Sequence, residues 1–156
     1  MARIEHFNNP NAPKPNSIVV AATVFVQDDQ GRVLLIQRTD NGLWALPGGA
    51  QDFGEYIAET AVRETREETG IEIEVTGVVG IYTNPNHVVE YSDGEVRQQF
   101  SICFRGRYVR GEPAMSDESS AVRWVARDEL GKLFIHPSMR LRVDTGFEQR
   151  SEPYIG

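Results

Sequence analysis

The feature that most constrains the fold of this chain is a helix with two chemically opposite faces, expected between Glu55 and Gly70. Its apolar positions recur at helical spacing and share one face; they are Ile57, Ala58, Ala61, Val62 and Thr65. Its acidic positions Glu64, Glu67 and Glu68 stand at i, i+3 and i+4, so their carboxylates share another face. Gly70 is expected to end the helix as a left-handed C-cap. We therefore expect the apolar back to be buried and the carboxylates to face a cleft.

The acidic face of this helix is the main functional signal. Like charges at these spacings destabilise a helix unless a cation neutralises them. Carboxylate oxygens on one rigid element are the ligands that Mg²⁺ or Mn²⁺ prefers, with water or phosphate oxygens completing the shell. The alternative is a solvent-exposed face with ion pairs between turns, of which Arg63 with Glu67 would be one. Both interpretations place the carboxylates on one side of the helix.

Segments with strand character lie on both sides of this helix in the sequence. They cover residues 18–27, 33–38, 43–46, 71–82, 96–109 and 122–126. Residues 18–27 are β-branched and apolar without strict alternation, as in a strand that is covered on both faces. A brief helical turn is expected at 128–130, and Pro137 opens a last amphipathic helix that reaches about Arg150. The order of strands, helix, strands and helix predicts an α/β fold with helices packed on a mixed β-sheet.

The length of 156 residues suits one domain. Residues 1–17 are expected to form a flexible N-terminal arm, because the stretch 6–17 is rich in Pro and Asn. Residues 18–150 would form the domain, and residues 151–156 a C-terminal tail. The single cysteine, Cys103, cannot form a disulfide within the chain, which favours a reducing compartment.

The balance of charge excludes some partners. A formal net charge of −7 argues against binding along a nucleic-acid backbone, which needs a basic stripe. It does not argue against a small phosphorylated substrate, because bound divalent cations reverse the sign of an acidic site. Apolar runs are far shorter than the roughly 20 residues that span a bilayer, and no apolar export segment follows the N-terminus. We expect a cytoplasmic protein with no nucleic-acid or membrane partner.

The segment Gly49–Ile71 resembles the signature of the Nudix hydrolase superfamily, to which MutT-like proteins belong. That signature is Gly, five residues, Glu, seven residues, Arg-Glu, two residues, Glu-Glu, one residue, Gly and an aliphatic residue. Its charged and glycine positions are all present as Gly49, Glu55, Arg63, Glu64, Glu67, Glu68 and Gly70. One departure is Thr65, where the family usually has an aliphatic residue. The hydroxyl of Thr65 can bond to the carbonyl four residues earlier, so we expect a small loss of packing and no loss of chemistry.

This resemblance implies a Nudix-type α/β/α sandwich that hydrolyses a nucleoside diphosphate linked to another group. It also implies that Glu67 and Glu68 are metal ligands, that Glu64 is a ligand or the general base, and that the carbonyl of Gly48 completes the metal shell. The metal would be Mg²⁺ or Mn²⁺. Such an ion neutralises phosphates, lowers the pKa of bound water and aligns it with phosphorus.

Other positions of the box are expected to be structural. The resemblance gives this role to Gly49, Glu55, Arg63 and Gly70, with Arg63 holding Glu67 in place. A downstream loop carboxylate commonly joins the site, and Glu118 is the best match for it; the alternative is a carboxylate that is simply solvated. Which of Glu64, Glu68 and Glu118 takes the proton stays open.

Candidate substrate contacts lie outside the box. Arg38 suits bidentate phosphate binding. Trp44 and Tyr82 could stack on a base, although such residues more often fill a core. His87 is expected in a polar loop, where substrate contact and plain exposure are both open. The position of Pro85 after the box is a weak family marker of ADP-ribose hydrolases.

We therefore expect a Mg²⁺-dependent hydrolase of nucleoside diphosphate-linked substrates, with ADP-ribose or a nucleotide sugar preferred. Two alternatives stay open: a nucleoside triphosphate pyrophosphohydrolase that removes oxidised nucleotides, and a non-catalytic Nudix binding or sensor domain. The intact carboxylates count against the last. A homodimer is frequent in the family and is compatible with the Pro-rich arm.

Overall fold

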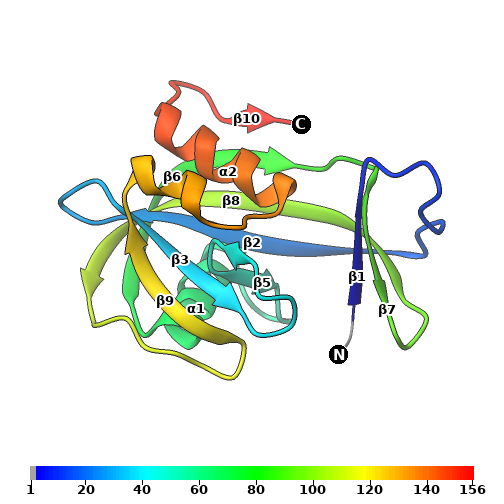
Figure 1. Ribbon diagram of the computed structural model, residues 1–156, viewed down its shortest axis with the longest axis horizontal. Coiled ribbons are helices and arrows are strands. Elements are labelled where there is room, and N and C mark those ends of the chain that lie inside the picture. Colours follow the sequence, from blue (N-terminus) through cyan, green and yellow to red (C-terminus); the bar gives the residue numbers. More distant parts are fainter. Residues whose placement is uncertain (1–2) are drawn as a thin grey trace.

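The computed structural model describes residues 3–156, and its strands form one curled, mixed β-sheet (Figure 1). The strands are β1 (Arg3–Phe7), β2 (Ser17–Gln27), β3 (Val33–Arg38), β4 (Trp44–Ala45), β5 (Gly48–Ala50), β6 (Glu72–Tyr82), β7 (His87–Tyr91), β8 (Val96–Arg110), β9 (Ser119–Val125) and β10 (Tyr154–Ile155). The helices are α1 (Ile57–Thr69) and α2 (Pro137–Glu148), and a short 3₁₀ helix covers Arg127–Lys132. The order of strands and helices confirms the predicted α/β class.

Strand β2 is the centre of the sheet. It runs parallel to β8 along its whole length and antiparallel to β3 and β5. Phe25 points into one hydrophobic cluster, whereas its neighbours Val24 and Val26 belong to another. Because successive side chains of a strand point to opposite faces, β2 is buried on both sides. This confirms the expectation of a strand that is covered on both faces.

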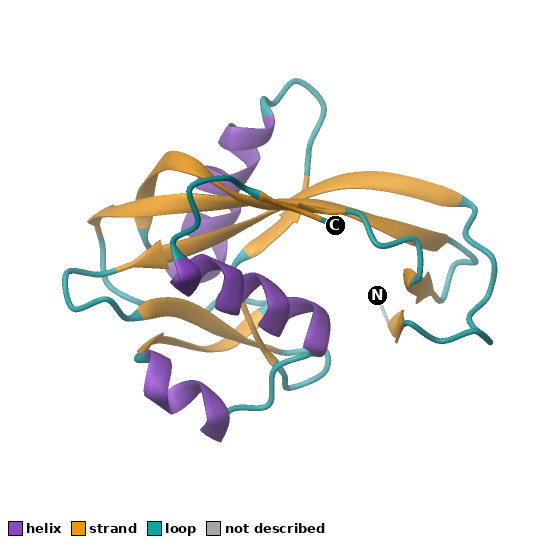
Figure 2. Ribbon diagram, turned by 90° about the horizontal axis from the view of Figure 1, so that it is seen from above, coloured by secondary structure: helices purple, strands orange, loops and turns teal. Residues whose placement is uncertain are grey.

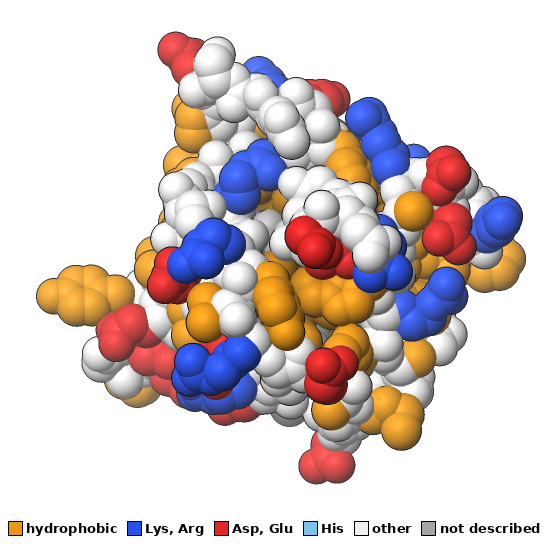
Figure 3. Space-filling view, turned by 90° about the vertical axis from the view of Figure 1, so that its left-hand side faces the viewer, with side chains coloured by type: hydrophobic (Ala, Val, Ile, Leu, Met, Phe, Trp, Pro, Cys, Tyr) orange, Lys and Arg blue, Asp and Glu red, His pale blue; other side chains and the backbone are white. Residues whose placement is uncertain are grey.

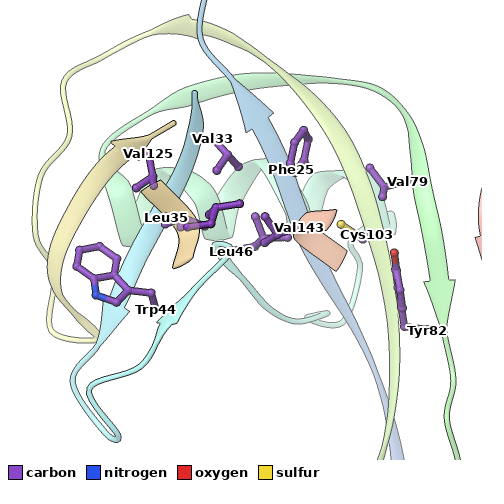
Figure 4. Packing of buried hydrophobic residues seen from close by; sticks show 11 residues of the cluster. Phe25, Val33, Leu35, Trp44, Leu46, Val79, Tyr82, Cys103, Val125 and Val143 are labelled. Atoms are coloured by element: carbon purple, nitrogen blue, oxygen red, sulfur yellow. The ribbon is translucent and has the colours of Figure 1, made fainter. Parts of the chain in front are cut away.

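One helix covers each face of the sheet, and Figure 2 shows helices on both sides of the strands. Helix α2 contributes Val143 to the cluster that contains Phe25 and Leu35, and Figure 4 shows these three side chains together. Helix α1 contributes Ala61 to the opposite cluster, which contains Val24. The result is the α/β/α sandwich that the sequence predicts.

The structure corrects the predicted ends of the chain. Arg3–Phe7, expected in a flexible arm, is strand β1 and pairs antiparallel with β7. Tyr154–Ile155, expected in the tail, pairs in parallel with β6. Both segments are short edge strands whose partners lie far away in the sequence, so local pattern does not reveal them. Residues 1–2 of the predicted arm lie outside the described residues.

Strands β5 and β7 are further elements that the sequence analysis did not foresee. The predicted strand before α1 ended at residue 46, and no strand was predicted over the residues of β7. Strand β7 forms a hairpin with β8, and its turn contains Gly94 at φ 95°. The hairpin carries β1 on its outer edge, away from β2 (Figure 1). His87, expected in a loop, is therefore the first residue of a strand.

Two further observations bear on expectations from composition. None of the helices in residues 3–156 is long and apolar enough to cross a membrane. On the face shown in Figure 3, basic and acidic side chains are intermingled rather than gathered by sign. Cys103 is a free, fully buried thiol within the core, as a small hydrophobic residue would be (Figure 4).

Candidate active site

Helix α1 is fixed at both ends by backbone contacts. At its start, the Glu59 carboxylate accepts a hydrogen bond from the backbone N–H of Tyr56 at 2.7 Å. At its end, Gly70 adopts φ 77° and its N–H donates to the carbonyl of Arg66 at 2.9 Å. This confirms the left-handed C-cap predicted for Gly70, a conformation that most other residues adopt only with strain.

The back of α1 is buried as predicted. Ala61 and Thr65 are fully buried. The Thr65 hydroxyl donates to the carbonyl of Ala61 at 2.8 Å, which is the bond expected for this departure from the Nudix pattern. The hydroxyl is therefore satisfied inside the core, and the face that carries the carboxylates keeps its orientation.

Arg63 is the hub that orders the acidic residues. Its Nε donates to Glu55 at 2.7 Å, and its Nη1 donates to Glu64 at 3.0 Å and to Glu67 at 3.2 Å. Its Nη2 also reaches the carbonyl of Ala50 at 3.3 Å. Hydrogen bonds from Arg63 lower the pKa of Glu55 to about 2, so this carboxylate is ionised over the whole neutral range. These contacts support the structural roles expected for Glu55 and Arg63.

Two glycines of strand β5 let the sheet approach α1 closely. The N–H of Gly48 donates to Glu68 at 3.2 Å. A Cβ at Gly49 would lie 2.5 Å from the Glu64 carboxyl group, and a Cβ at Gly48 would lie 2.1 Å from the carbonyl oxygen of Ala22. A side chain at Gly49 would therefore push β5 away from Glu64, and one at Gly48 would push β5 away from β2.

The carboxyl groups of Glu64 and Glu68 form a crowded, buried pair. Glu68 is only 4% exposed, whereas the side chain of Glu67 is half exposed. Burial, followed by the neighbouring Glu64 carboxylate, raises the pKa of Glu68 well above its usual range. Burial also raises the pKa of Glu64. The positive charge of Arg63 is too little to offset the burial and mutual repulsion of these two carboxyl groups.

A divalent cation fits this donor set. The available atoms are hard carboxylate oxygens at i, i+3 and i+4, and they carry negative charge that the chain does not balance. Within residues 3–156, no three His, Cys, Asp or Glu side chains are already gathered as a preformed metal cluster. Arg63 holds oxygens of Glu64 and Glu67 here, so these side chains would need to turn to bind an ion.

The loop before β9 completes the site. A cleft of about 260 Å³ is lined by Glu64, Glu67, Glu68, Ser116, Asp117 and Glu118. The negative charge of Glu118 contributes to the raised pKa of Glu68, although less than burial does. The structure therefore brings the predicted Glu118 next to the helix carboxylates. We call this feature the carboxylate cleft.

Ser119 is a residue of this site that the sequence analysis missed. It is fully buried, and its hydroxyl donates to the backbone carbonyl of Glu68 at 2.6 Å. It also lies 2.7 Å from the hydroxyl of Ser116. These bonds hold the loop of Glu118 against α1. A serine in a polar loop gives no sequence signal for such a role, because its partner lies far away in the chain.

The four candidate substrate contacts have different environments. Arg38 forms a two-point ion pair with Asp40, at 2.9 and 2.7 Å. Trp44 and Tyr82 belong to the hydrophobic core (Figure 4), which is the alternative kept beside base stacking. His87 is 5% exposed and its Nε2 lies 2.6 Å from Glu5, so it is neither a loop residue nor exposed. Of the four, only Arg38 lies outside the core and outside a buried contact, since its ion pair with Asp40 is exposed.

Comparison with known proteins identifies the family. The family model described as NUDIX domain matches residues 18–143 of this chain. The chain belongs to this family. Its solved members include a Nudix hydrolase of Nitrosomonas europaea, which superimposes with a TM-score of 0.74 at 21% identity and covers 90% of this chain and 80% of that one. This likeness confirms the Nudix fold.

Several relatives carry MutT-like or nucleotide-related names. A MutT-like protein of Streptomyces ambofaciens is 36% identical, over 78% of this chain and 71% of that protein. An ADP-ribose pyrophosphatase of Methanocaldococcus jannaschii is 32% identical, over 73% and 65%. The nucleoside triphosphatase NudI of an Enterobacter species is 29% identical, over 75% and 88%. The protein is therefore a Nudix pyrophosphohydrolase, and the names of these relatives include both an ADP-ribose pyrophosphatase and a nucleoside triphosphatase.

Proposed function

We propose that this Nudix protein is a Mg²⁺-dependent enzyme, with Mn²⁺ as a substitute, and that it hydrolyses the pyrophosphate bond of ADP-ribose or a related nucleoside diphosphate sugar. The observation that carries the metal dependence is the carboxylate cleft. Glu64, Glu67 and Glu68 of α1 meet Glu118 of a separate loop there, with more negative charge than Arg63 balances. A pyrophosphate substrate is anionic and would be repelled from this cleft unless cations were bound in it.

The residues of the carboxylate cleft would both bind the cation and transfer the proton. Glu67 and Glu68 would hold the cation, together with Glu64 and the carbonyl of Gly48. The bound cation would neutralise the phosphates and lower the pKa of an attacking water. A carboxylate whose pKa is raised in the empty cleft is suited to exchange a proton near neutral pH, as are those of Glu64 and Glu68. Glu118 stays a third candidate because it lines the same cleft.

The choice of ADP-ribose is supported mainly by the relative of that name. The polar loop after β6 contributes less than the sequence suggested, because Tyr82 lies in the core and His87 binds Glu5. Asn84 is also engaged, since its Nδ2 donates to Asn8 at 3.0 Å. The alternative, hydrolysis of nucleoside triphosphates, is favoured by the relative named a triphosphatase. The same substrate panel tests both. Cytoplasmic location and a homodimer stay predictions.

A substrate panel with purified protein tests the proposal. We would compare kcat/KM for ADP-ribose, a nucleoside diphosphate sugar and nucleoside triphosphates, each with Mg²⁺ and with EDTA. The proposal expects AMP from ADP-ribose to appear faster than pyrophosphate from any triphosphate, and no turnover in EDTA. Faster release of pyrophosphate would overturn the substrate and leave the metal site standing. Turnover that persists in EDTA would overturn the metal dependence.

A matched pair of variants assigns the turnover to the cleft. Glu68→Gln removes a buried carboxylate from the cleft. Glu59→Gln changes the same residue type on the same helix, at a position whose capping bond glutamine can also make. Only Glu68→Gln should lose activity. Equal loss in both variants would mean that the assay reports helix stability rather than chemistry.

A further inference from the structure

A second cavity lies apart from the carboxylate cleft, between α2, the end of β6 and the β1–β7 edge. Its volume is about 280 Å³. Its apolar lining comes from Phe7, Tyr82, Leu141 and Tyr154, and its polar lining includes Asn84 and Arg142. It shares no lining residue with the carboxylate cleft. We call this cavity the Arg142 pocket.

Arg142 is a buried cation without an acidic partner. The residue is 5% exposed, and its Nε has no hydrogen-bond partner. Its Nη1 contacts the sulfur of Met139 at 4.0 Å, and its guanidinium lies over the Tyr82 ring at 5.2 Å. Among residues 3–156, no carboxylate forms an ion pair with it. Buried charges in proteins are normally paired, so this arrangement is incomplete.

The acidic residue whose charge acts on Arg142 is already engaged. The negative charge of Glu5 acts on Arg142, but its carboxylate accepts a hydrogen bond from His87 at 2.6 Å. The same carboxylate lies 3.7 Å from His136 and 3.7 Å from Arg3. Glu5 is therefore held by three other groups. Burial also lowers the pKa of Arg142, which is the direction expected for a cation that lacks compensation.

Another arginine on the same helix does form an ion pair, so the missing acidic partner of Arg142 is not a general property of α2. Arg140, two residues earlier on α2, forms an ion pair with Asp144 at 2.8 Å on the exposed side. Arg142 instead lines a cavity whose walls are mainly aromatic and aliphatic, with Asn84, His87 and Ser138 as further polar residues. A ligand that completes this site needs a negative group for the guanidinium and an apolar part for the walls.

We propose that the Arg142 pocket binds a small organic oxyanion, with its phosphate or carboxylate group against Arg142 and its apolar part against Phe7 and Tyr154. The planar guanidinium can donate two parallel hydrogen bonds to either group. A cavity of about 280 Å³ has room for one such group and one ring. The site is separate from the carboxylate cleft and requires no metal.

Binding to the metal-free protein tests this proposal. We would titrate the protein in EDTA with phenyl phosphate, with benzoate and with the neutral benzyl alcohol, by calorimetry and by thermal melts. EDTA leaves the carboxylate cleft negative, so that anions are repelled from it. The proteins would be the wild type, Arg142→Met and the matched control Arg140→Met. Because methionine fills a similar apolar volume, Arg142→Met is expected to fold.

The expected result is that at least one of the two anions binds the wild type and Arg140→Met. Binding to Arg142→Met should be at least about tenfold weaker, and benzyl alcohol should not bind detectably. The anion that binds better identifies the phosphate or the carboxylate as the preferred group. If Arg142→Met does not fold, Arg142→Lys takes its place, because it keeps the charge and loses the two-point geometry.

Three outcomes would overturn the proposal. One is that neither anion binds the wild type at tens of millimolar. Another is that the Arg142 variant binds the anions as well as the wild type does. The third is that benzyl alcohol binds as tightly as the anions, which would make the pocket an apolar cavity without a role for the guanidinium.

Discussion

The carboxylate cleft and the Arg142 pocket differ in the sign of the charge that the chain leaves unbalanced. In the cleft, Glu64 and Glu67 share one basic partner, Arg63, and Glu68 forms no ion pair within residues 3–156. In the pocket, Arg142 has no acidic partner among the described residues. Each site is completed by a ligand of opposite charge, a cation in the first and an oxyanion in the second. The comparison shows that the two sites should respond to different ligands and to different substitutions.

The largest expected effect separates the sites by activity. Glu68→Gln should lower kcat/KM by at least about 100-fold at saturating Mg²⁺, because it removes a carboxylate that we expect to hold the cation. Steady-state kinetics on the preferred substrate measure this loss. Arg142→Met serves as the contrast and should keep the kcat/KM of the wild type while losing anion binding. Full activity of Glu68→Gln would overturn the assignment of the cleft.

The next effect separates the sites by their response to metal. Mg²⁺ that binds only the native state stabilises it by about 2.7 kcal/mol at a concentration 100 times Kd. Each kcal/mol raises Tm by about 2–4 °C in a domain of this size. Melts with Mg²⁺ and with EDTA should therefore differ in the wild type and in Arg142→Met alike, and much less in Glu68→Gln. Melts that coincide for the wild type at tens of millimolar Mg²⁺ would mean that the carboxylates are only solvated.

A smaller effect is the pH dependence of stability without metal. Burial, followed by the charge of Glu64, raises the pKa of Glu68 above its ordinary value of 4.5. The native state thus holds this proton more tightly than the unfolded state, so the stabilisation is complete below that ordinary value and is lost as the pH rises. In EDTA, Tm of the wild type should fall between about pH 5 and pH 8, and Glu68→Gln should reduce this fall. The lowered pKa values of Glu5 and Glu55 act at more acidic pH, outside this window.

The contrast between the two sites also explains how much the sequence could predict. The cleft could be predicted from the sequence because its main residues lie on one helix at fixed spacing. The cap at Gly70 and the hydrogen bond of Thr65 were predicted correctly because they too depend only on neighbouring residues of that helix. The α/β class followed from the order of the segments. The Arg142 pocket could not be predicted from the sequence, because its residues come from the start, the middle and the end of the chain.

Long-range pairing was the other limit. Strand β1 exists because β7 offers it an edge, and Ser119 bonds to α1 across a gap of about fifty positions in the chain. His87 was expected in a loop for the same reason, since its partner Glu5 lies on β1. Local pattern carries no information about such partners. The roles of residues that depend on a distant neighbour could therefore be seen only in the structure.

The smallest expected effect is the coupling between the two sites. The two cavities have no lining residue in common, and Glu68 and Arg142 share no hydrogen-bond partner. Substitutions at independent sites add within about 0.5 kcal/mol in their free energies of unfolding. Glu68→Gln and Arg142→Met should each leave the metal-free protein as stable or more stable, because each removes an unbalanced buried charge. Urea unfolding in EDTA of the wild type, the two single variants and the double variant measures the coupling. A coupling above about 1 kcal/mol would mean that the charges of the two sites act on each other through the protein, and they would then form one extended site rather than two.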